Sequence, residues 1–317
     1  MIGPYRWNRG VGMNKRFYKQ NQLNLLNGLL FSLPWLIGFL LFIVYPLITS
    51  MYYSFTDFNM FQTPKFTGLK NYSQLIQDPL FYKSLYNTLF MTGIGGPIYI
   101  VIGIFAAILL NTKIRGLSVF RTIFYIPYIL PIVATALLWI WVLNPQTGLM
   151  NMMIGGLGIR GPNWLGDPRY TKISLILIGA WRTGPIMILF LAALQDIPRV
   201  LYEAATIDGA STTRKFFTIT LPMLTPAILF QIIMQIIINL QYFTEAYIIT
   251  GASDRLNQSV GGPLNSLLFY STYLYQNAFN YMKMGKASAM AWVLFLISAL
   301  ITVLIFKSSK RWVHYGD

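Results

Sequence analysis

The chain has 317 residues, of which 55% are hydrophobic and only 10% are charged. Soluble globular domains carry roughly 25% charged residues, so this composition argues against an ordinary soluble protein. The formal net charge of +15 reflects a scarcity of acids, nine in all, and binding to nucleic acid is not expected. The chain has no cysteine and its one histidine is His314, which excludes a disulfide framework and argues against a metal site.

The charged residues leave long uncharged stretches between them. A bilayer core about 30 Å thick needs about 20 apolar residues in a helix to cross it. Five stretches reach that length without a charge, and a sixth is interrupted only by Arg182. The spacing therefore predicts an all-α membrane protein with six transmembrane spans, at residues 29–50, 87–110, 122–143, 173–194, 224–249 and 287–306.

These spans divide the chain into a basic N-terminal tail (1–27), one transmembrane domain (28–307) and a C-terminal tail (308–317). Basic residues are about twice as dense in the loops that share a side with the termini, which predicts that both termini are cytoplasmic. The first apolar stretch is longer than the 7 to 15 residues typical of a secretory signal, so we expect it to be retained. The N-terminal tail either lies along an anionic leaflet or is a solvated segment.

The predicted cytoplasmic loop between the fourth and fifth spans has the residues expected at the ends of two short helices. Asp196 is a candidate cap for a helix over about 199–207, and Gly209 can provide a left-handed stop. Ser211 can cap a second helix. Small side chains beside Glu203 leave room for another protein to approach. The residues alone are also consistent with a solvated loop in which Glu203 pairs with a basic residue one turn earlier.

A longer motif in this loop carries a resemblance. Residues 203–222 read EAATIDGASTTRKFFTITLP, which resembles the cytoplasmic loop of permeases in binding-protein-dependent ABC importers. That motif has Glu-Ala-Ala, three residues, Gly, nine residues and Ile-x-Leu-Pro, and the spacing here matches in full. YPLITSMYYSFTDFN (45–59), GPNWLGDP (161–168) and GKASA (285–289) are similar to the sugar-permease branch of the family.

The resemblance implies a six-helix bundle of the ABC importer permease type, with a coupling helix between spans four and five that sits in a groove of a cytoplasmic ATPase. The residues it assigns to coupling are Glu203, Ala204, Ala205, Asp208, Gly209, Ile219, Leu221 and Pro222. It also implies a second homologous permease subunit in a heterodimer, two ABC ATPase subunits and an extracytoplasmic solute-binding protein. One departure is the segment 252–260, which is inserted in the predicted outer loop.

Span five carries a polar stripe. Five polar residues follow one another at spacings of 4, 4, 3 and 3, which places them on one helical face: Gln231, Gln235, Asn239, Tyr242 and Glu245. Such a stripe either joins neighbouring helices through hydrogen bonds or lines a path for a sugar. We assign Asn239, Tyr242 and Glu245 to the path. Tyr247 either stacks on a sugar ring or is an interfacial anchor.

Arg182 is the other polar group predicted inside the membrane. It lies in the segment Trp181-Arg182-Thr183-Gly184-Pro185, where Pro185 removes a backbone donor and favours a break in the helix. A buried charge should face the bundle interior or a water-filled path. Arg182 therefore either lines the substrate route or pairs with freed carbonyls or with an acid on another helix.

The sequence has no Gly-x-x-x-x-Gly-Lys-Ser/Thr phosphate loop, so we expect no enzymatic activity and no cofactor in the chain itself. The hypothesis is a permease subunit of an ABC importer that moves a sugar or oligosaccharide across the bacterial cytoplasmic membrane. The alternative, an ion- or proton-coupled transporter, would have only Glu245 and Arg182 as a relay. A membrane-embedded hydrolase lacks convergent acids or a Ser/His pair. The basic outer loops would attract an acidic saccharide, whereas the Glu245 carboxylate in the pathway would repel one. The sequence therefore does not decide which saccharide is the substrate.

Overall fold

The computed structural model describes residues 24, 27–112, 115–253 and 261–314. The predictions for the N-terminal tail (1–27) and for the inserted segment 252–260 fall almost entirely outside these residues. Within them the chain is mostly helical, with turns and one short antiparallel hairpin formed by β1 (Thr56–Asp57) and β2 (Lys65–Phe66).

Helices follow one another along the described chain. Short π-helical segments continue several of them and, like one 3₁₀ turn, are labelled η. The first half contains η1 (Leu40–Val44), α2 (Tyr45–Ser54), α3 (Lys70–Ile76), α4 (Pro79–Phe90), η2 (Met91–Gly95), α5 (Gly96–Leu110), α6 (Leu117–Ile129), α7 (Ile132–Val142) and α8 (Leu149–Gly155). The second half contains α9 (Pro168–Trp181), α10 (Gly184–Gln195), α11 (Arg199–Ile207), α12 (Thr212–Lys215), η3 (Phe216–Thr220), α13 (Leu221–Met223), α14 (Thr225–Leu240), α15 (Thr244–Ser253), the 3₁₀ turn η4 (Pro263–Asn265), α16 (Tyr270–Tyr275), η5 (Gln276–Asn280) and α17 (Met284–Ser309).

Four helices are long and apolar enough to cross a membrane: Asn27–Ser54, Pro79–Leu110, Thr225–Gly251 and Met284–Ser309. Each overlaps one of the predicted spans, so the structure has apolar helices of sufficient length at these places. The largest difference between predicted and observed bounds is at the start of the second span, which begins at Pro79 instead of residue 87. Asp78 caps this helix, because its carboxylate accepts a hydrogen bond from the N–H of Leu80.

The other two predicted spans are bent pairs of helices. The chain bends by 97° between α6 and α7 and by 50° between α9 and α10. Leu130 and Pro131 separate the first pair with extended backbone, because the residue before a proline avoids the helical conformation. The span predicted over 122–143 is therefore sharply bent at Leu130 and Pro131, a feature that the sequence analysis did not predict. The described residues hold four helices that are long and apolar enough to cross a membrane, or up to six if each bent pair is one span.

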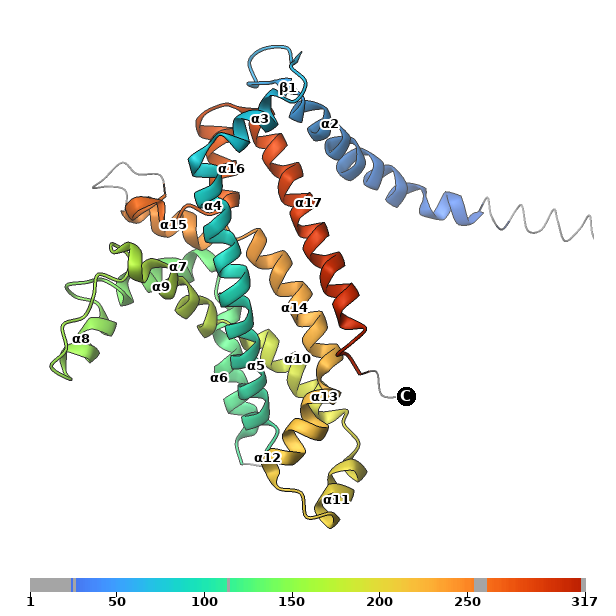
Figure 1. Ribbon diagram of the computed structural model, residues 1–317, viewed down its shortest axis with the longest axis vertical. Coiled ribbons are helices and arrows are strands. Elements are labelled where there is room, and N and C mark those ends of the chain that lie inside the picture. Colours follow the sequence, from blue (N-terminus) through green and yellow to red (C-terminus); the bar gives the residue numbers. More distant parts are fainter. Residues whose placement is uncertain (1–23, 25–26, 113–114, 254–260, 315–317) are drawn as a thin grey trace, which may run out of the picture.

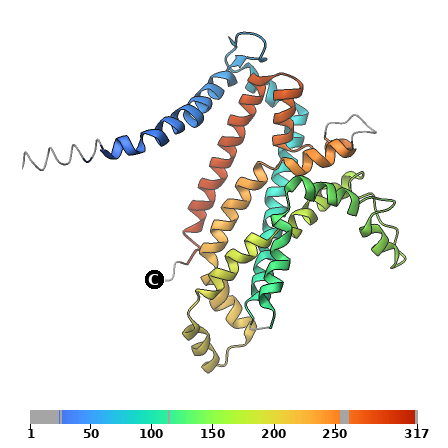
Figure 2. The ribbon, with the colours of Figure 1, turned by 180° about the vertical axis from the view of Figure 1, so that it is seen from behind.

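Two groups of connections lie at opposite ends of the molecule, while α8 and the segment that joins α7 to α9 project from its side (Figure 1). The β1–β2 hairpin, α3 and α16 lie at one end, which we call the hairpin end (Figure 1). The segment α11 to α13 lies at the opposite end, which we call the α11 end (Figures 1 and 2). α17 runs down toward the α11 end, where the backbone N–H of His314 donates to Thr225 Oγ1 over 2.9 Å at the start of α14.

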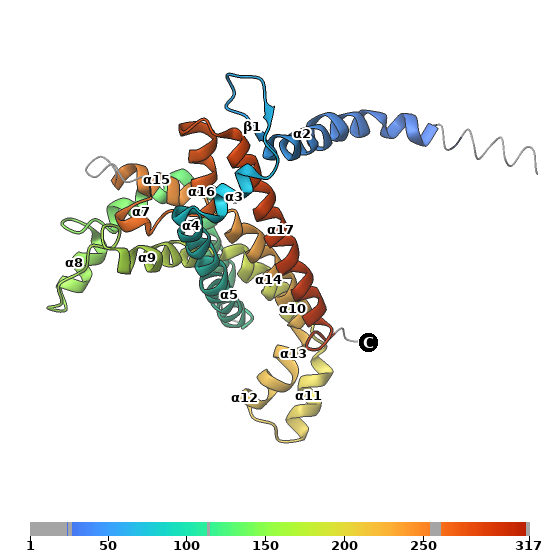
Figure 3. The same ribbon diagram turned by 45° about the horizontal axis from the view of Figure 1, so that its top comes forward.

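Three apolar clusters hold the helices together. The first joins α5 to α10 around the fully buried Met187 and Phe190, the second joins α7, α9 and α15, and the third joins α3, α4, α16 and α17. The α5–α10 contact is close because Gly103 has no side chain: a Cβ there would lie 2.4 Å from Ile186 Cγ2. The helix Asn27–Ser54 differs, since its most apolar stretch buries none of its residues and projects away from the bundle (Figure 3).

Candidate functional site

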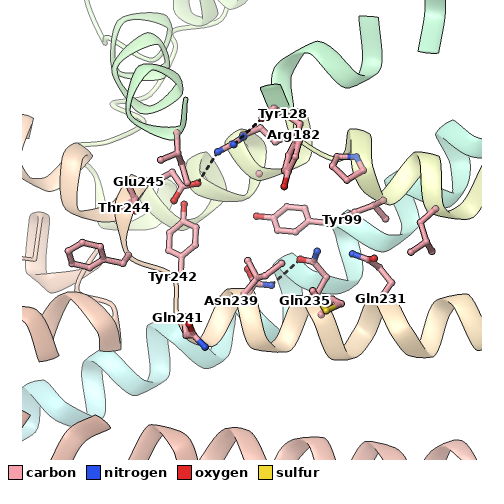
Figure 4. A pocket seen from close by; sticks show the side chains of 18 of the residues that line it. Tyr99, Tyr128, Arg182, Gln231, Gln235, Asn239, Gln241, Tyr242, Thr244 and Glu245 are labelled. Carbon is pink, nitrogen blue, oxygen red and sulfur yellow. Dashed lines mark hydrogen bonds and ion pairs between the residues drawn. The ribbon is translucent and has the colours of Figure 1, made fainter. Parts of the chain in front are cut away.

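A cavity of about 540 Å³ lies where α5, α9, α10 and α14 meet (Figure 4). Small-molecule sites usually have volumes of about 300–1,000 Å³ and combine apolar walls with a few convergent polar groups. The polar side chains that line this cavity are Tyr99, Tyr128, Arg182, Gln231, Gln235, Asn239, Gln241, Tyr242, Thr244 and Glu245.

The polar stripe predicted in span five lines this cavity. Gln231, Gln235 and Asn239 are buried on one face of α14, and Asn239 Nδ2 donates to Gln235 Oε1 over 3.4 Å. The sequence predicts that the stripe follows one helix, but the helix is interrupted between the end of α14 and the start of α15. Tyr242 lies in that interruption and Glu245 in the first turn of α15, and both still reach the cavity (Figure 4).

Arg182 lies in the predicted break of span four. α9 ends at Trp181 and α10 begins at Gly184, with Pro185 in its first turn. Proline has no N–H to give to the preceding turn, so the chain bends here and the Arg182 side chain can leave the helix axis toward the cavity. The break and its cause agree with the prediction.

Arg182 and Glu245 form an ion pair across the cavity. Arg182 Nη1 lies 3.6 Å from Glu245 Oε1, and the two side chains are only 15% and 12% exposed. The second guanidinium nitrogen lies 3.5 Å from the Tyr128 carbonyl oxygen, and the guanidinium carbon lies 5.6 Å from the centre of the Tyr128 ring, close enough for a cation–π contact. Both alternatives predicted for Arg182 are therefore present in the structure, since its side chain pairs with an acid on another helix and also lines the cavity.

Four polar lining residues were not identified from the sequence: Tyr99, Tyr128, Gln241 and Thr244. Tyr99 carries the one hydroxyl group in the apolar run of α5, and this was the one feature of the sequence that could have indicated its role. A uniformly apolar helix does not reveal which face points toward the bundle interior. Its ring fits beside α9 because Gly179 has no side chain: a Cβ there would lie 2.3 Å from the Tyr99 hydroxyl. Tyr128 lies on α6 next to the bend that the sequence did not predict.

The two tyrosines proposed to contact a sugar have different surroundings. Tyr242 lines the cavity and packs edge-on against Phe269, with ring centres 5.0 Å apart. Tyr247 does not line it. Its side chain is half exposed and stacks on Phe243 at 5.2 Å and against Tyr275 at 5.3 Å. This position favours a packing role for Tyr247, whose assignment to the pathway stays a prediction.

The loop between spans four and five forms a second candidate site at the α11 end. The helix α11 has the bounds that the sequence predicts, and Gly209 ends it with φ of +72°. The N–H of Ala210 donates to the Ala205 carbonyl over 2.9 Å, which is the bond expected when a left-handed glycine closes a helix. Asp196 does not cap the helix as expected, because Pro198 occupies the capping position.

One face of α11 is anchored to the next segment of the chain. The Tyr202 hydroxyl and Thr220 Oγ1 lie 2.8 Å apart, and Lys215 Nζ donates to Thr206 Oγ1 over 2.8 Å. Tyr202 and Ile219 both pack against the α5–α10 cluster. These contacts connect α11 mechanically to the helices that line the cavity.

The other face of α11 is exposed. Glu203, Ala204, Asp208 and Gly209 all lie on the surface, and Ala205 is half-buried. No ion pair between Glu203 and a basic residue is present in the described part of the chain, so the alternative of a local Glu203 pair finds no support there. Leu221 and Pro222 are half-buried in α13, where the loop rejoins the bundle.

Residues 99–314 match the family described as the binding-protein-dependent transport system inner membrane component. The chain belongs to this family of transport permeases. A probable ABC transporter permease of Bacillus subtilis, YesP, is 41% identical over 293 residues, which cover 92% of each chain. The lactose transport system permease LacF of Rhizobium radiobacter is 36% identical and covers 94% of this chain and 96% of its own.

A solved structure gives the same family assignment. A bacterial ABC transporter involved in the import of the acidic polysaccharide alginate has a chain that is 25% identical, with a TM-score of 0.73. The alignment covers 93% of this permease and 99% of that chain. The resemblance to binding-protein-dependent ABC importer permeases that the loop motif indicated is therefore confirmed, and the family is one of transport permease components.

Proposed function

We propose that this permease is one of two transmembrane subunits of an ATP-driven importer that carries a sugar or oligosaccharide across the bacterial cytoplasmic membrane. The observation that carries the proposal is α11, a short helix that is anchored on one face and exposed on the other at the end of the bundle. In this proposal the exposed face seats in a groove of a cytoplasmic ATPase subunit.

The apolar surface of α11 supports a protein partner. Val200 and Ile207 are 70% and 88% exposed, and Phe217 on the following segment is 60% exposed. Exposed apolar side chains gathered on one short helix are typical of an interaction surface. The sequence has no phosphate loop, so the partner has to supply ATP hydrolysis, and movement of α11 would reach the cavity through Tyr202 and Ile219.

The unburied first helix supports a second permease subunit. The α2 part of Asn27–Ser54 contacts α17, and the helix leaves most of its apolar surface uncovered. Lipid can cover such a surface, but the cavity at α14 is also open at one side, as expected for half of a pathway. We infer a heterodimer of two related subunits with two ATPases below it, and an extracytoplasmic binding protein at the hairpin end.

The orientation and the substrate complete the proposal. The six spans, counting each bent pair once, would place the α11 end and the C-terminus in the cytoplasm, where basic residues are denser. The amides, hydroxyls and aromatic rings of the cavity suit the hydroxyls and the ring faces of a saccharide. The similarity to a lactose permease and to an alginate importer supports a saccharide without deciding its charge.

ATP-dependent uptake in proteoliposomes tests the proposal. The permease is reconstituted with its companion subunits, and uptake of radiolabelled saccharide is measured with ATP inside or outside the vesicle lumen. We expect uptake that depends on ATP at the α11 side and is lost in Glu203→Ala and Gly209→Pro variants that still insert. Uptake that follows a proton or sodium gradient without an ATPase would contradict the proposal and favour a secondary transporter.

A further inference from the structure

Among the described residues that line the cavity, two have charged side chains, and these two form an ion pair with each other. Arg182 and Glu245 contribute opposite charges 3.6 Å apart, while the remaining polar groups are amides, hydroxyls and backbone atoms. The half of the pathway that this permease supplies therefore has no net charge. A carboxylate on a substrate would meet an attractive and a repulsive charge at similar distances.

The guanidinium of Arg182 already faces two partners. One terminal nitrogen faces Glu245, the other faces the Tyr128 carbonyl, and Nε is buried without a hydrogen-bond partner in the described structure. Carboxylates bind arginine most strongly through two parallel hydrogen bonds. With one terminal nitrogen directed at Glu245 and the other at the Tyr128 carbonyl, a second carboxylate cannot bond to both nitrogens while these contacts remain. An acidic substrate would have to displace Glu245, which would leave a buried carboxylate unpaired.

A neutral saccharide meets no such cost. The amides of Gln231, Gln235 and Asn239 each offer a donor and an acceptor along one wall, and the Tyr99 and Tyr242 rings face the space opposite (Figure 4). Hydroxyl groups can exchange their hydrogen bonds to water for bonds to these groups without transferring a charge from water.

We propose that Glu245 is a specificity-determining residue that restricts the cavity to uncharged saccharides by occupying the guanidinium of Arg182. This inference rests on the proposed function as a sugar permease and adds the charge class of the substrate. Without the Glu245 carboxylate, Arg182 becomes an unpaired cation in the wall, and the same cavity accepts a uronic acid.

Direct binding to the permease complex tests this inference. The two permease subunits with their ATPases are placed in nanodiscs without the solute-binding protein, so that only the membrane cavity selects the ligand. The probes are neutral disaccharides and trisaccharides and their uronic-acid counterparts, such as galactobiose and digalacturonate. Saturation-transfer NMR titrations then give the ratio of neutral to acidic affinity for each variant.

We expect the wild-type complex to bind neutral members of the panel and to bind their uronate counterparts at least roughly tenfold more weakly. Glu245→Gln, which keeps the shape and removes the charge, should tighten uronate binding by roughly tenfold or more. Glu245→Asp keeps the charge and should retain the wild-type ratio. Arg182→Gln combined with Glu245→Gln should bind neutral saccharides and still reject uronates, and thermal melting of each complex checks that it is folded.

The outcomes separate this inference from the proposed function. Equal binding of neutral and acidic saccharides by the wild-type complex, or an unchanged ratio in folded Glu245→Gln, would overturn the role of Glu245 and leave the sugar permease intact. Failure of every saccharide in the panel to bind the wild-type complex would instead overturn the sugar assignment on which the inference rests.

Discussion

Lys286 Nζ lies 2.6 Å from Asp78 Oδ2 and joins the start of α17 to the cap of α4 across 208 positions of sequence. The Tyr273 hydroxyl of α16 donates to the same carboxylate oxygen. The Lys286 and Asp78 side chains are only 13% and 14% exposed, so three segments meet at one nearly buried ion pair at the hairpin end.

Removing the lysine should destabilise the permease. Lys286→Met leaves the Asp78 carboxylate with a hydroxyl but without its cation, and unpairing a buried charge costs about 3 kcal/mol or more. Thermal unfolding in detergent measures the change. The matched control is Arg169→Met, which removes the exposed ion pair with Asp167 and should leave the melting temperature unchanged. Equal melting temperatures for Lys286→Met and wild type would argue against a structural role for the pair.

The same pair predicts a dependence of stability on pH. Burial raises the pKa of the Asp78 carboxyl, but hydrogen bonds from Lys286 and Tyr273 and the charge of Lys286 lower it more, so the pKa lies below its usual 3.8. A carboxyl whose pKa is lower in the folded state contributes stability that is complete above its unfolded pKa and is lost as the pH falls through the folded value.

We therefore expect wild-type stability to decline below about pH 4 partly through protonation of Asp78. Asp78→Asn should be less stable at pH 7 and should lose this part of the acid dependence. Melting temperatures from pH 3 to 7 for both proteins give the comparison. Parallel curves across this range would show that Asp78 has the same pKa in the folded and unfolded states.

A second stability prediction concerns the α5–α10 contact. Gly103→Ala would place a Cβ 2.4 Å from Ile186 Cγ2, and the helices would have to separate, which costs about 1–3 kcal/mol. Gly93→Ala is the control, because no atom lies within 4 Å of the Cβ it adds, and a helical alanine is slightly more stable than glycine. Melting temperatures that fall for both variants alike would show that close approach at Gly103 is not the cause.

The contact between α11 and η3 predicts a coupling defect. Tyr202→Phe keeps the packing of the ring and removes the 2.8 Å contact with Thr220 Oγ1. We expect the complex with the ATPase to form and hydrolyse ATP, with uptake per ATP lowered several-fold, because α11 can move without moving the bundle. Thr213→Val, an exposed change on α12, should have no effect. A normal ratio of transport to hydrolysis in Tyr202→Phe would exclude this contact from coupling.

The two tyrosines near α15 predict different phenotypes. Tyr242→Ala opens the cavity wall and removes a ring from it, so uptake should fall or the range of accepted saccharides should broaden. Tyr247→Ala removes a ring stacked outside the cavity, so the saccharide range should stay the same. Competition assays with unlabelled saccharides distinguish the two results. The reverse pattern would assign the pathway to Tyr247.

The local features of the fold could be predicted from the sequence. Gaps between charges locate the membrane helices, because burying a charge in lipid is costly, and Gly209 and Pro185 mark an end and a break through backbone properties that do not depend on packing. The spacing of the Gln231 to Glu245 stripe likewise indicates which side chains share a wall.

The features that depend on contacts between distant segments could not be predicted. Nothing in the sequence pairs Lys286 with Asp78 until the bundle brings them together. For Arg182 the sequence indicated an acid on another helix as one alternative, and only the fold identifies it as Glu245. Tyr99 was missed because an entirely apolar helix has no polar face to orient it. The 97° bend at Pro131 was missed because proline is tolerated inside many membrane helices.

The side of the membrane on which α11 lies decides whether this helix can contact a cytoplasmic ATPase. The chain has no cysteine, so Glu203→Cys provides a single thiol on α11, and Lys65→Cys provides one on the hairpin at the opposite end. A membrane-impermeant maleimide is added to intact spheroplasts and to permeabilised ones. We expect position 65 to be labelled in both preparations and position 203 only after permeabilisation, when added ATPase should protect it. Labelling of position 203 in intact spheroplasts would contradict the coupling role of α11.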